Sequence, residues 1–282
     1  MNKPNFIVVG AQRCGTTWLY ENLSNHPEVY MSEEKELNFF SDLNDNKFSL
    51  GEPWYFSNFD DANNVKCIGE ITPEYLVCDL AYRRIKKTLG AIKIIVIVRN
   101  PLDRIVSSYK RGLREGDWDV SFDEYVSQSM DYCIDRSLYA KDIKKYIDEF
   151  GAEQVKILLY DDIYDNPKFF LEELYGFLNI STDIDSRLAD KKFNIGISNK
   201  TITLRISLLI RDFLYKFQFG KPFVKSIQRT SFGNFIMSRL LKSPPKKALD
   251  YSFDQNLIHR INKSIDELFE ILNDERVLEW KK

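Results

Sequence analysis

Histidine and cysteine are scarce in this sequence: its 282 residues include two histidines and four cysteines, and no two cysteines form a CxxC pair. Structural zinc sites use closely spaced Cys and His ligands, so this pattern excludes a zinc finger or ribbon. Few cysteines in a chain of this length also argue against a disulfide framework. The thiols are therefore expected to be reduced, as in a cytoplasmic protein.

Long apolar runs are missing as well. The first apolar run, Phe6–Val9, has four residues and ends at Gly10. The core of a secretory signal needs about 7–15 apolar residues, and a membrane-spanning helix needs about 20. No run approaches these lengths, so we expect a cytoplasmic protein without a membrane span.

The sequence also has no overall excess of one charge, because 40 Lys and Arg are balanced by 42 Asp and Glu. This balance excludes a uniformly basic surface for nucleic acid. The charges are nevertheless unevenly spread, since residues 200–247 hold eleven Lys and Arg against the single acid Asp212. We expect this basic segment to be mostly helical. Two roles remain open for it: an interfacial helix that binds an anionic surface or acceptor, or a solvated helix face that packs on the core.

Strand and helix patterns alternate through the first two thirds of the chain. Short apolar or β-branched runs predict strands at 6–10, 65–70, 92–98 and 155–160. Amphipathic patterns predict helices between them, at 101–114, 138–150 and 167–178, and a terminal helix at 253–272. This order predicts one α/β domain over residues 1–282, with a central parallel sheet flanked by helices and a largely helical C-terminal region.

The loop after the first strand carries a phosphate-binding pattern. It reads Gly10-Ala-Gln-Arg-Cys-Gly-Thr-Thr and leads into a helix, with the glycine spacing of a P-loop. The Lys that normally follows the second glycine is replaced by Thr16, and the loop carries Arg13 instead. A plain strand-to-helix turn explains two glycines but not a cation and two hydroxyls at the helix start. The loop is therefore predicted to bind an anion.

A second element lies at the end of the strand 92–98. Arg99 follows the strand directly, and Ser107 comes eight residues later on the helix that Pro101 begins. Ligands of open α/β sheets bind at this carboxyl edge, where a guanidinium and a hydroxyl together suit one phosphate. Taken alone, Arg99 is better explained by a salt bridge to Asp103 at the helix start. The pairing with the Arg13 loop favours the phosphate site.

These two motifs resemble those of sulfotransferases that use 3'-phosphoadenosine 5'-phosphosulfate (PAPS). Arg-Cys-Gly-Thr-Thr-Trp at 13–18 resembles the family's 5'-phosphosulfate loop, and Arg99 with Ser107 resembles its 3'-phosphate element. The resemblance covers roughly residues 5–180 and a terminal helix, and is nearest to the bacterial and heparan-sulfate-modifying branches. It implies a P-loop-NTPase-like sheet, PAPS as co-substrate, 3'-phosphoadenosine 5'-phosphate (PAP) as product, and no metal.

The resemblance also assigns roles to individual residues. Glu36, in Glu-Leu-Asn-Phe-Phe, matches the family's general base, although it could also be one more solvated acid in its charged run. Arg13 takes the place of a lysine that stabilises the leaving phosphate. Trp18 matches an adenine-stacking residue, with core packing as an equal alternative. The residues implied in donor binding are Arg13, Cys14, Gly15, Thr16, Thr17, Trp18, Arg99 and Ser107. Ile71 occupies the place of a second family lysine, whose contact Lys35 could supply.

The function predicted from the sequence is sulfuryl transfer from PAPS to a hydroxyl or amine of a carbohydrate, glycolipid or other glycoconjugate. Two alternatives remain. Asp161 and Asp162 follow a buried strand as in a Walker B motif, which would suit a P-loop kinase or ATPase with Mg-ATP. The basic segment 200–247 would suit a non-catalytic protein that binds polyanions or the membrane periphery.

Overall fold

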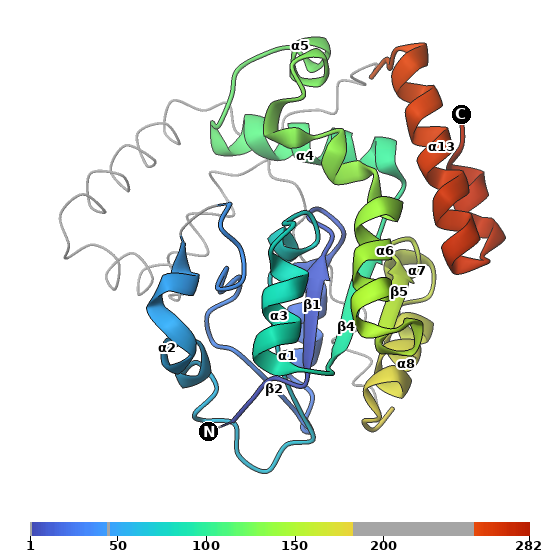
Figure 1. The fold of residues 1–282 in the computed structure, drawn as a ribbon. Helices are drawn as coiled ribbons and strands as arrows, with labels where there is room; N and C mark the ends of the chain where they lie inside the picture. The colour runs from blue at the N-terminus through green and yellow to red at the C-terminus, as the bar shows by residue number, and fades with distance from the viewer. Residues whose placement is uncertain (1, 44–45, 183–250) are drawn as a thin grey trace, which may run out of the picture. The chain divides into compact units, whose positions relative to one another are not determined.

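The computed structural model describes residues 2–43, 46–182 and 251–282. Its centre is a sheet of five parallel strands in the order β2-β3-β1-β4-β5 (Figure 1). The strands are β1 (Phe6–Gly10), β2 (Val29–Met31), β3 (Cys67–Ile71), β4 (Lys93–Val98) and β5 (Val155–Leu159). Because the strands are parallel, their carboxyl ends all lie at the same edge of the sheet. The loops that follow the adjacent strands β1, β4 and β5 therefore lie next to one another.

Helices cover this sheet. The longer ones are α1 (Thr16–Ser24), α2 (Gly51–Ser57), α3 (Ala81–Leu89), α4 (Pro101–Glu115), α5 (Phe122–Ser127), α6 (Tyr139–Phe150), α8 (Pro167–Leu178) and α13 (Gln255–Leu272). In Figure 1, α3 and α6 lie side by side in front of the sheet, and α1 lies behind β1. This confirms the predicted α/β fold with a parallel sheet flanked by helices.

The central strands explain why the fold is stable. All residues of β1 are buried, and in β4 every residue from Ile94 to Val98 is fully buried. Buried aliphatic side chains stabilise a fold by about 25 cal/mol for each Å² of apolar surface removed from water. A β-branched run packed on both faces is the pattern expected for the middle of a parallel sheet.

The predicted elements agree closely with the structure in the middle of the sheet and less well at its edge. The strand 6–10 and the helix 167–178 have the predicted bounds, and the strand predicted at 92–98 begins one residue later, at Lys93. Strand β2 and helices α2 and α3 were not predicted. Strand β2 has three residues, too few for an alternating pattern to be recognised.

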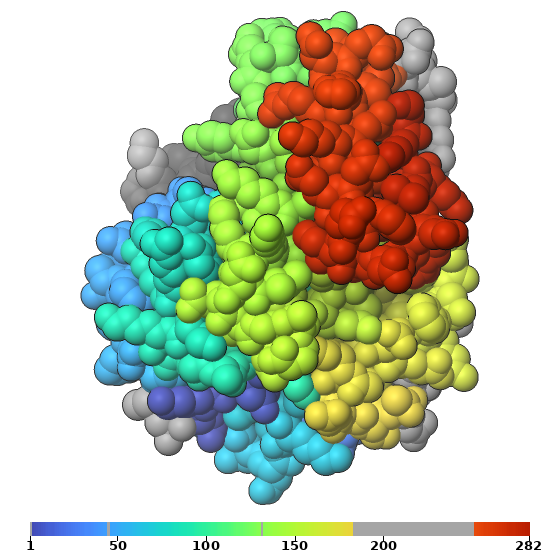
Figure 2. Space-filling view, turned by 45° about the vertical axis from the view of Figure 1, so that its right-hand side comes forward, coloured from blue at the N-terminus to red at the C-terminus, as the bar shows by residue number. Residues whose placement is uncertain are grey.

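The C-terminal helix α13 packs against α6, and Figure 2 shows it beside α6 and the segment that contains α7 (Asp162–Asp165) and α8. Its first turn is capped by Asp254, whose carboxylate accepts a hydrogen bond from the Leu257 N–H. After α13, a 3-10 segment, η6 (Glu275–Trp280), buries Val277 and Trp280. Residues far apart in the sequence thus form one layer beside β5.

Residues 109–122, together with 251–252, belong to a compact unit distinct from the one that holds the sheet. Within it, Tyr109, Phe122 and Tyr251 form an aromatic cluster with ring centroids 4.7 to 6.3 Å apart. The basic segment 200–247 lies outside the described residues, and a single domain over 1–282 stays a prediction. Among the helices that the structure describes, none is both long and apolar enough to cross a bilayer.

One ionisable group in the core affects stability. The Glu70 carboxylate on β3 is fully buried and accepts hydrogen bonds from the hydroxyls of Tyr55, Thr72 and Tyr75. Burial raises the pKa of Glu70 to about 7, because removing the charged form from water outweighs these hydrogen bonds. The folded state therefore holds this proton more tightly than the unfolded chain does.

We predict that Glu70 makes the protein less stable as pH rises from about 4.5 to about 7. A carboxyl whose pKa is higher in the folded state adds most to the free energy of unfolding at pH values below its unfolded pKa. This stabilisation, here about 3 kcal/mol, disappears as the pH rises to the folded pKa. In urea unfolding experiments, the free energy of unfolding of Glu70→Gln should fall less between these pH values than that of the wild type. Asp148→Asn, which changes an exposed carboxylate, is the control. Equal slopes in wild type and Glu70→Gln would contradict the prediction.

Candidate functional site

The loop between β1 and α1 has the geometry of an anion-binding P-loop. Gly15 immediately precedes α1 with φ of 83°, a conformation that glycine adopts without strain. A Cβ atom added there would lie 2.6 Å from Cδ1 of Ile163, so a larger residue does not fit. The first turn of α1 holds no acidic residue. Its backbone N–H groups and helix dipole therefore favour an anion at this point.

The structure brings the two predicted phosphate motifs together. Arg13 Nε donates a hydrogen bond to Ser107 Oγ at 3.3 Å, and Arg99 Nη1 donates to the Arg13 carbonyl at 3.5 Å. These residues lie far apart in the sequence but follow the neighbouring strands β1 and β4. Two guanidinium groups and a hydroxyl thus gather at the carboxyl edge, where the chain leaves β1 toward one side of the sheet and β4 toward the other.

The surroundings of Arg99 distinguish between its two predicted roles. Its guanidinium stacks on the ring of Tyr160, with 4.4 Å between Cζ and the centroid. Asp103 is exposed, and no ion pair joins it to Arg99 within the described part of the chain. The helix-start salt bridge is therefore not formed. Stacking on Tyr160 holds the guanidinium in place without neutralising its charge.

Glu36 lies beside the P-loop helix. Lys35 Nζ donates to Thr17 Oγ1 at 2.9 Å and lies 3.2 Å from Oε1 of Glu36. The Glu36 side chain is 49 % exposed, so it is accessible to a substrate from solvent. Its backbone N–H donates to the carbonyl of Ile71, which ties this segment to the end of β3. The predicted base and the predicted anion loop are therefore joined through Lys35.

Cys14 and Trp18, two of the predicted donor-binding residues, have buried side chains. The Cys14 thiol is fully buried 3.9 Å from the Tyr139 hydroxyl, and burial raises its pKa to about 11. A neutral thiol leaves only the Cys14 backbone to face a phosphate. The Trp18 ring is 5 % exposed and packs edge-to-face on Phe170 of α8, at 5.5 Å between centroids. This contact is the packing alternative, and adenine stacking by Trp18 stays a prediction.

Support beneath the loop was not predicted from the sequence. Arg104 of α4 is fully buried and donates to the carbonyl and the side-chain oxygen of Gln12, at 3.3 and 3.1 Å. Arg136 forms a two-point ion pair with Glu74 at 2.7 and 2.9 Å, and also reaches the Gln12 side chain at 3.4 Å. Both guanidinium groups hold the loop from inside the protein. Arg104 also adds positive charge behind it, whereas Glu74 balances the charge of Arg136.

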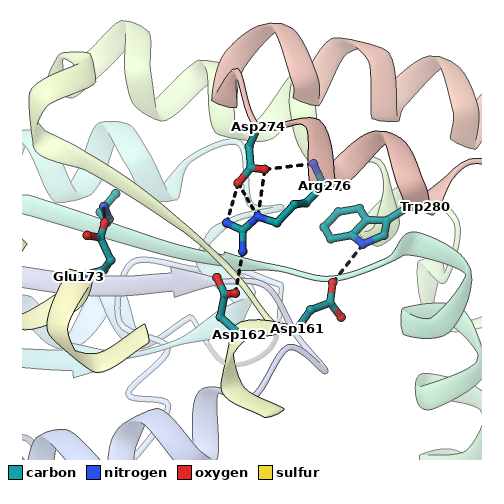
Figure 3. Close-up of polar contacts among 7 residues, drawn as sticks. Asp161, Asp162, Glu173, Asp274, Arg276 and Trp280 are labelled. Carbon is teal, nitrogen blue, oxygen red and sulfur yellow. Dashed lines mark hydrogen bonds and ion pairs between the residues drawn. The ribbon is translucent and has the colours of Figure 1, made fainter. Parts of the chain in front are cut away.

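The Walker B alternative can be examined at the end of β5. Asp161 Oδ2 accepts a hydrogen bond from the Trp280 indole at 3.0 Å, and Asp162 Oδ1 pairs with Arg276 at 2.7 Å (Figure 3). Asp274 holds the other side of the Arg276 guanidinium. Both aspartates thus serve to dock the segment after α13 on β5, which accounts for them without a magnesium ion.

Neither histidine lies where a general base is needed. His26 is buried in a turn, where its Nδ1 accepts from the Glu28 N–H and its Nε2 donates to the Ser181 carbonyl. His259 is exposed on α13. Among the described residues, no group of three or more His, Cys, Asp or Glu is placed to hold a metal ion.

Comparisons with known proteins agree with these motifs. A family model for the sulfotransferase domain matches residues 3–195. The membrane-associated sulfotransferase kil1 of Dictyostelium discoideum is 36 % identical over 109 residues, or 38 % of this chain and 22 % of that protein. Heparan sulfate glucosamine 3-O-sulfotransferase 5 of Mus musculus is 28 % identical over 189 residues, or 63 % of this chain and 54 % of that protein. This chain thus spans between about a fifth and about half of these two relatives.

Solved structures give the same family and fold. A sulfotransferase from Alicyclobacillus acidocaldarius aligns with a TM-score of 0.60 and 29 % identity, over 74 % of this chain and 90 % of its own. Mouse sulfotransferase SULT7A1, solved with PAP, aligns with a TM-score of 0.52 and 14 % identity, over 99 % and 88 %. The second likeness concerns the fold alone. With the family model covering well over half of its length, and with both phosphate motifs in one place, the chain belongs to the sulfotransferase family of enzymes.

Proposed function

We propose that this protein transfers a sulfuryl group from PAPS to a hydroxyl or amine of a carbohydrate or glycoconjugate. The observation that carries the proposal is the meeting of Arg13 with Ser107 and Arg99 at the carboxyl edge of β1 and β4. A donor with phosphates at both its 5' and 3' positions needs two anion sites on one face. A nucleotide triphosphate needs only the first.

The donor would be held by the two motifs. The N–H groups of Gly15, Thr16 and Thr17 at the start of α1 suit the 5'-phosphate. Arg99 and Ser107 suit the 3'-phosphate, because a guanidinium donates two parallel hydrogen bonds and a hydroxyl adds a third. Arg13 is always charged, so it would stabilise the negative charge that develops on the leaving phosphate without giving up a proton.

The transfer itself needs a base and a cation on the acceptor side. The sulfur–oxygen bond to the 5'-phosphate breaks while a new one forms to the acceptor oxygen or nitrogen, and PAP leaves. Glu36 would take the acceptor proton, and Lys35 would face the sulfonate from its position between Thr17 and Glu36. Loose in-line transfers of this kind depend mainly on positioning and on charge stabilisation.

The acceptor class rests on the relatives. Several are named for heparan sulfate, among them the glucosamine 3-O-sulfotransferase and the bifunctional N-deacetylase/N-sulfotransferase 1 of Mus musculus. An oxygen or a nitrogen acceptor on a sugar therefore suits this chain. The basic segment 200–247 would favour an acceptor that already carries negative charge.

Calorimetry with PAP in buffer containing EDTA tests the donor site, and we expect binding without metal. A screen of PAPS-dependent sulfate transfer to sugars, polysaccharides and lipid glycans then identifies the acceptor. Tight binding of Mg-ATP without binding of PAP would instead support the kinase alternative. Binding to glycans or vesicles without transfer to any acceptor would support the non-catalytic one.

A further inference from the structure

The buried Glu70 carboxylate lies beneath the segment that carries Glu36. Tyr55 donates to Glu70 Oε1 at 2.8 Å, Thr72 donates to Oε2 at 2.8 Å, and the Tyr75 hydroxyl lies 3.3 and 3.4 Å from the two oxygens. No ion pair neutralises Glu70 within the described part of the chain. A buried carboxylate without a cation is costly, and the three hydroxyl donors reduce that cost.

Two of these hydroxyls also contact the segment above them. Thr72 Oγ1 accepts the Asn38 N–H at 3.4 Å, and the Tyr75 hydroxyl accepts the Phe40 N–H at 3.3 Å. A hydroxyl has a single proton. When that proton points to a carboxylate, the oxygen lone pairs are left for other donors. Glu70 thus fixes the direction in which both hydroxyls face the backbone of residues 38–40.

This segment needs such anchoring. Glu36 has φ of 62° and Asn38 has φ of 55°, in the left-handed region that residues other than glycine rarely adopt. Conformations of this kind persist where the surrounding structure fixes them. The backbone of Ile71 holds Glu36, and the two hydroxyls hold positions 38 and 40. All of these contacts come from β3 and the residues directly after it.

We infer that Glu70 is a positioning residue for the general base: through Thr72 and Tyr75 it holds residues 36–40 so that the Glu36 carboxylate faces the transferring group. This inference rests on the proposed role of Glu36. Glu70 itself touches neither donor nor acceptor in this arrangement. Its effect on turnover is carried entirely by the two hydroxyls that also hold the segment.

Tyr55 provides a matched control. Tyr55→Phe and Tyr75→Phe each remove one hydroxyl from the same carboxylate and keep the ring, but only the Tyr75 hydroxyl also accepts an N–H of the segment. Misplacing a reacting group by about 1 Å can cost about 100-fold in rate. We expect Tyr75→Phe and Thr72→Val to lower kcat by about 10- to 100-fold with an unchanged KM for PAPS. Tyr55→Phe should change kcat by less than about twofold.

Amide hydrogen exchange gives a readout that does not require activity. Tyr75→Phe should speed exchange in residues 36–40, and Tyr55→Phe should not. Equal effects of Tyr55→Phe and Tyr75→Phe on kcat and on exchange would overturn the inference in favour of a purely structural role. Normal kcat and normal exchange in Tyr75→Phe would overturn it as well. If Glu36→Gln keeps full activity, the proposed base is wrong, whereas faster or unchanged exchange of residues 36–40 in Glu70→Gln still decides whether Glu70 holds the segment.

Discussion

Replacing Glu36 with Gln should abolish most of the transfer activity while PAP binding stays unchanged. The amide keeps the shape of the side chain but cannot take a proton, and general-base catalysis contributes about 100- to 10,000-fold. The proposed donor site lies in the loop after β1 and at the end of β4, so the contacts there are not altered. Initial rates with saturating PAPS and calorimetry with PAP measure the two effects separately.

Glu33→Gln is the control for this experiment, because Glu33 is an exposed acid in the same charged run and its carboxylate forms no ion pair within the described part of the chain. It should leave both the rate and PAP binding unchanged. Turnover of Glu36→Gln at the wild-type rate would remove Glu36 as the base. Loss of PAP binding in the same variant would instead place Glu36 in the donor site.

Replacing Arg99 with Ala should weaken PAP binding by about 10- to 100-fold, which corresponds to the loss of a hydrogen bond to a charged group. The ligand AMP separates two explanations, since it shares the adenine and 5'-phosphate of PAP but has no 3'-phosphate. Binding of AMP should change little. Calorimetry for PAP and competition for AMP provide the measurements.

The comparison with AMP is needed because Arg99 also donates a hydrogen bond to the Arg13 carbonyl in the loop. If Arg99 only supported the loop, both ligands would lose affinity equally, and the 3'-phosphate role would be excluded. Arg83→Ala, which removes an exposed guanidinium on α3, should affect neither ligand. Trp18→Phe would further test the adenine contact without leaving a large cavity.

The sequence was sufficient to predict the centre of the fold and the meeting of the two motifs that carry Arg13 and Arg99. Strand β4 is β-branched without a break from Ile94 to Val98, and the P-loop follows β1 directly, so local patterns determine both. Parallel strands end at one edge, which is why Arg13 and Arg99 could be expected to meet. Their contacts through Ser107 and the Arg13 carbonyl agree with this expectation.

Sequence patterns could not give the supporting residues. Arginine is rarely fully buried, so Arg104 would be expected at the surface from the sequence alone. A signal was nevertheless present, because Pro101, Arg104, Ile105 and Ser108 share the buried face of α4 at helical spacing. Lys35 was suggested only as a substitute for the family lysine that Ile71 replaces. Its hydrogen bond to Thr17 could not be predicted, since tertiary packing decides the direction of a flexible side chain.

The place of β1 in the sheet has a consequence for how the protein is made. It is the first strand of the chain, yet its neighbours begin pairing at Gly69 and Lys93, so long loops must close before it is enclosed. The anion loop depends on the later neighbour, because the Ala11 N–H donates to the Ile97 carbonyl. A nascent chain that has not yet emerged through β4 therefore carries the complete P-loop sequence without its structure. The contacts of Arg13 with Arg99 and Ser107 form only after the chain has emerged beyond Ser107.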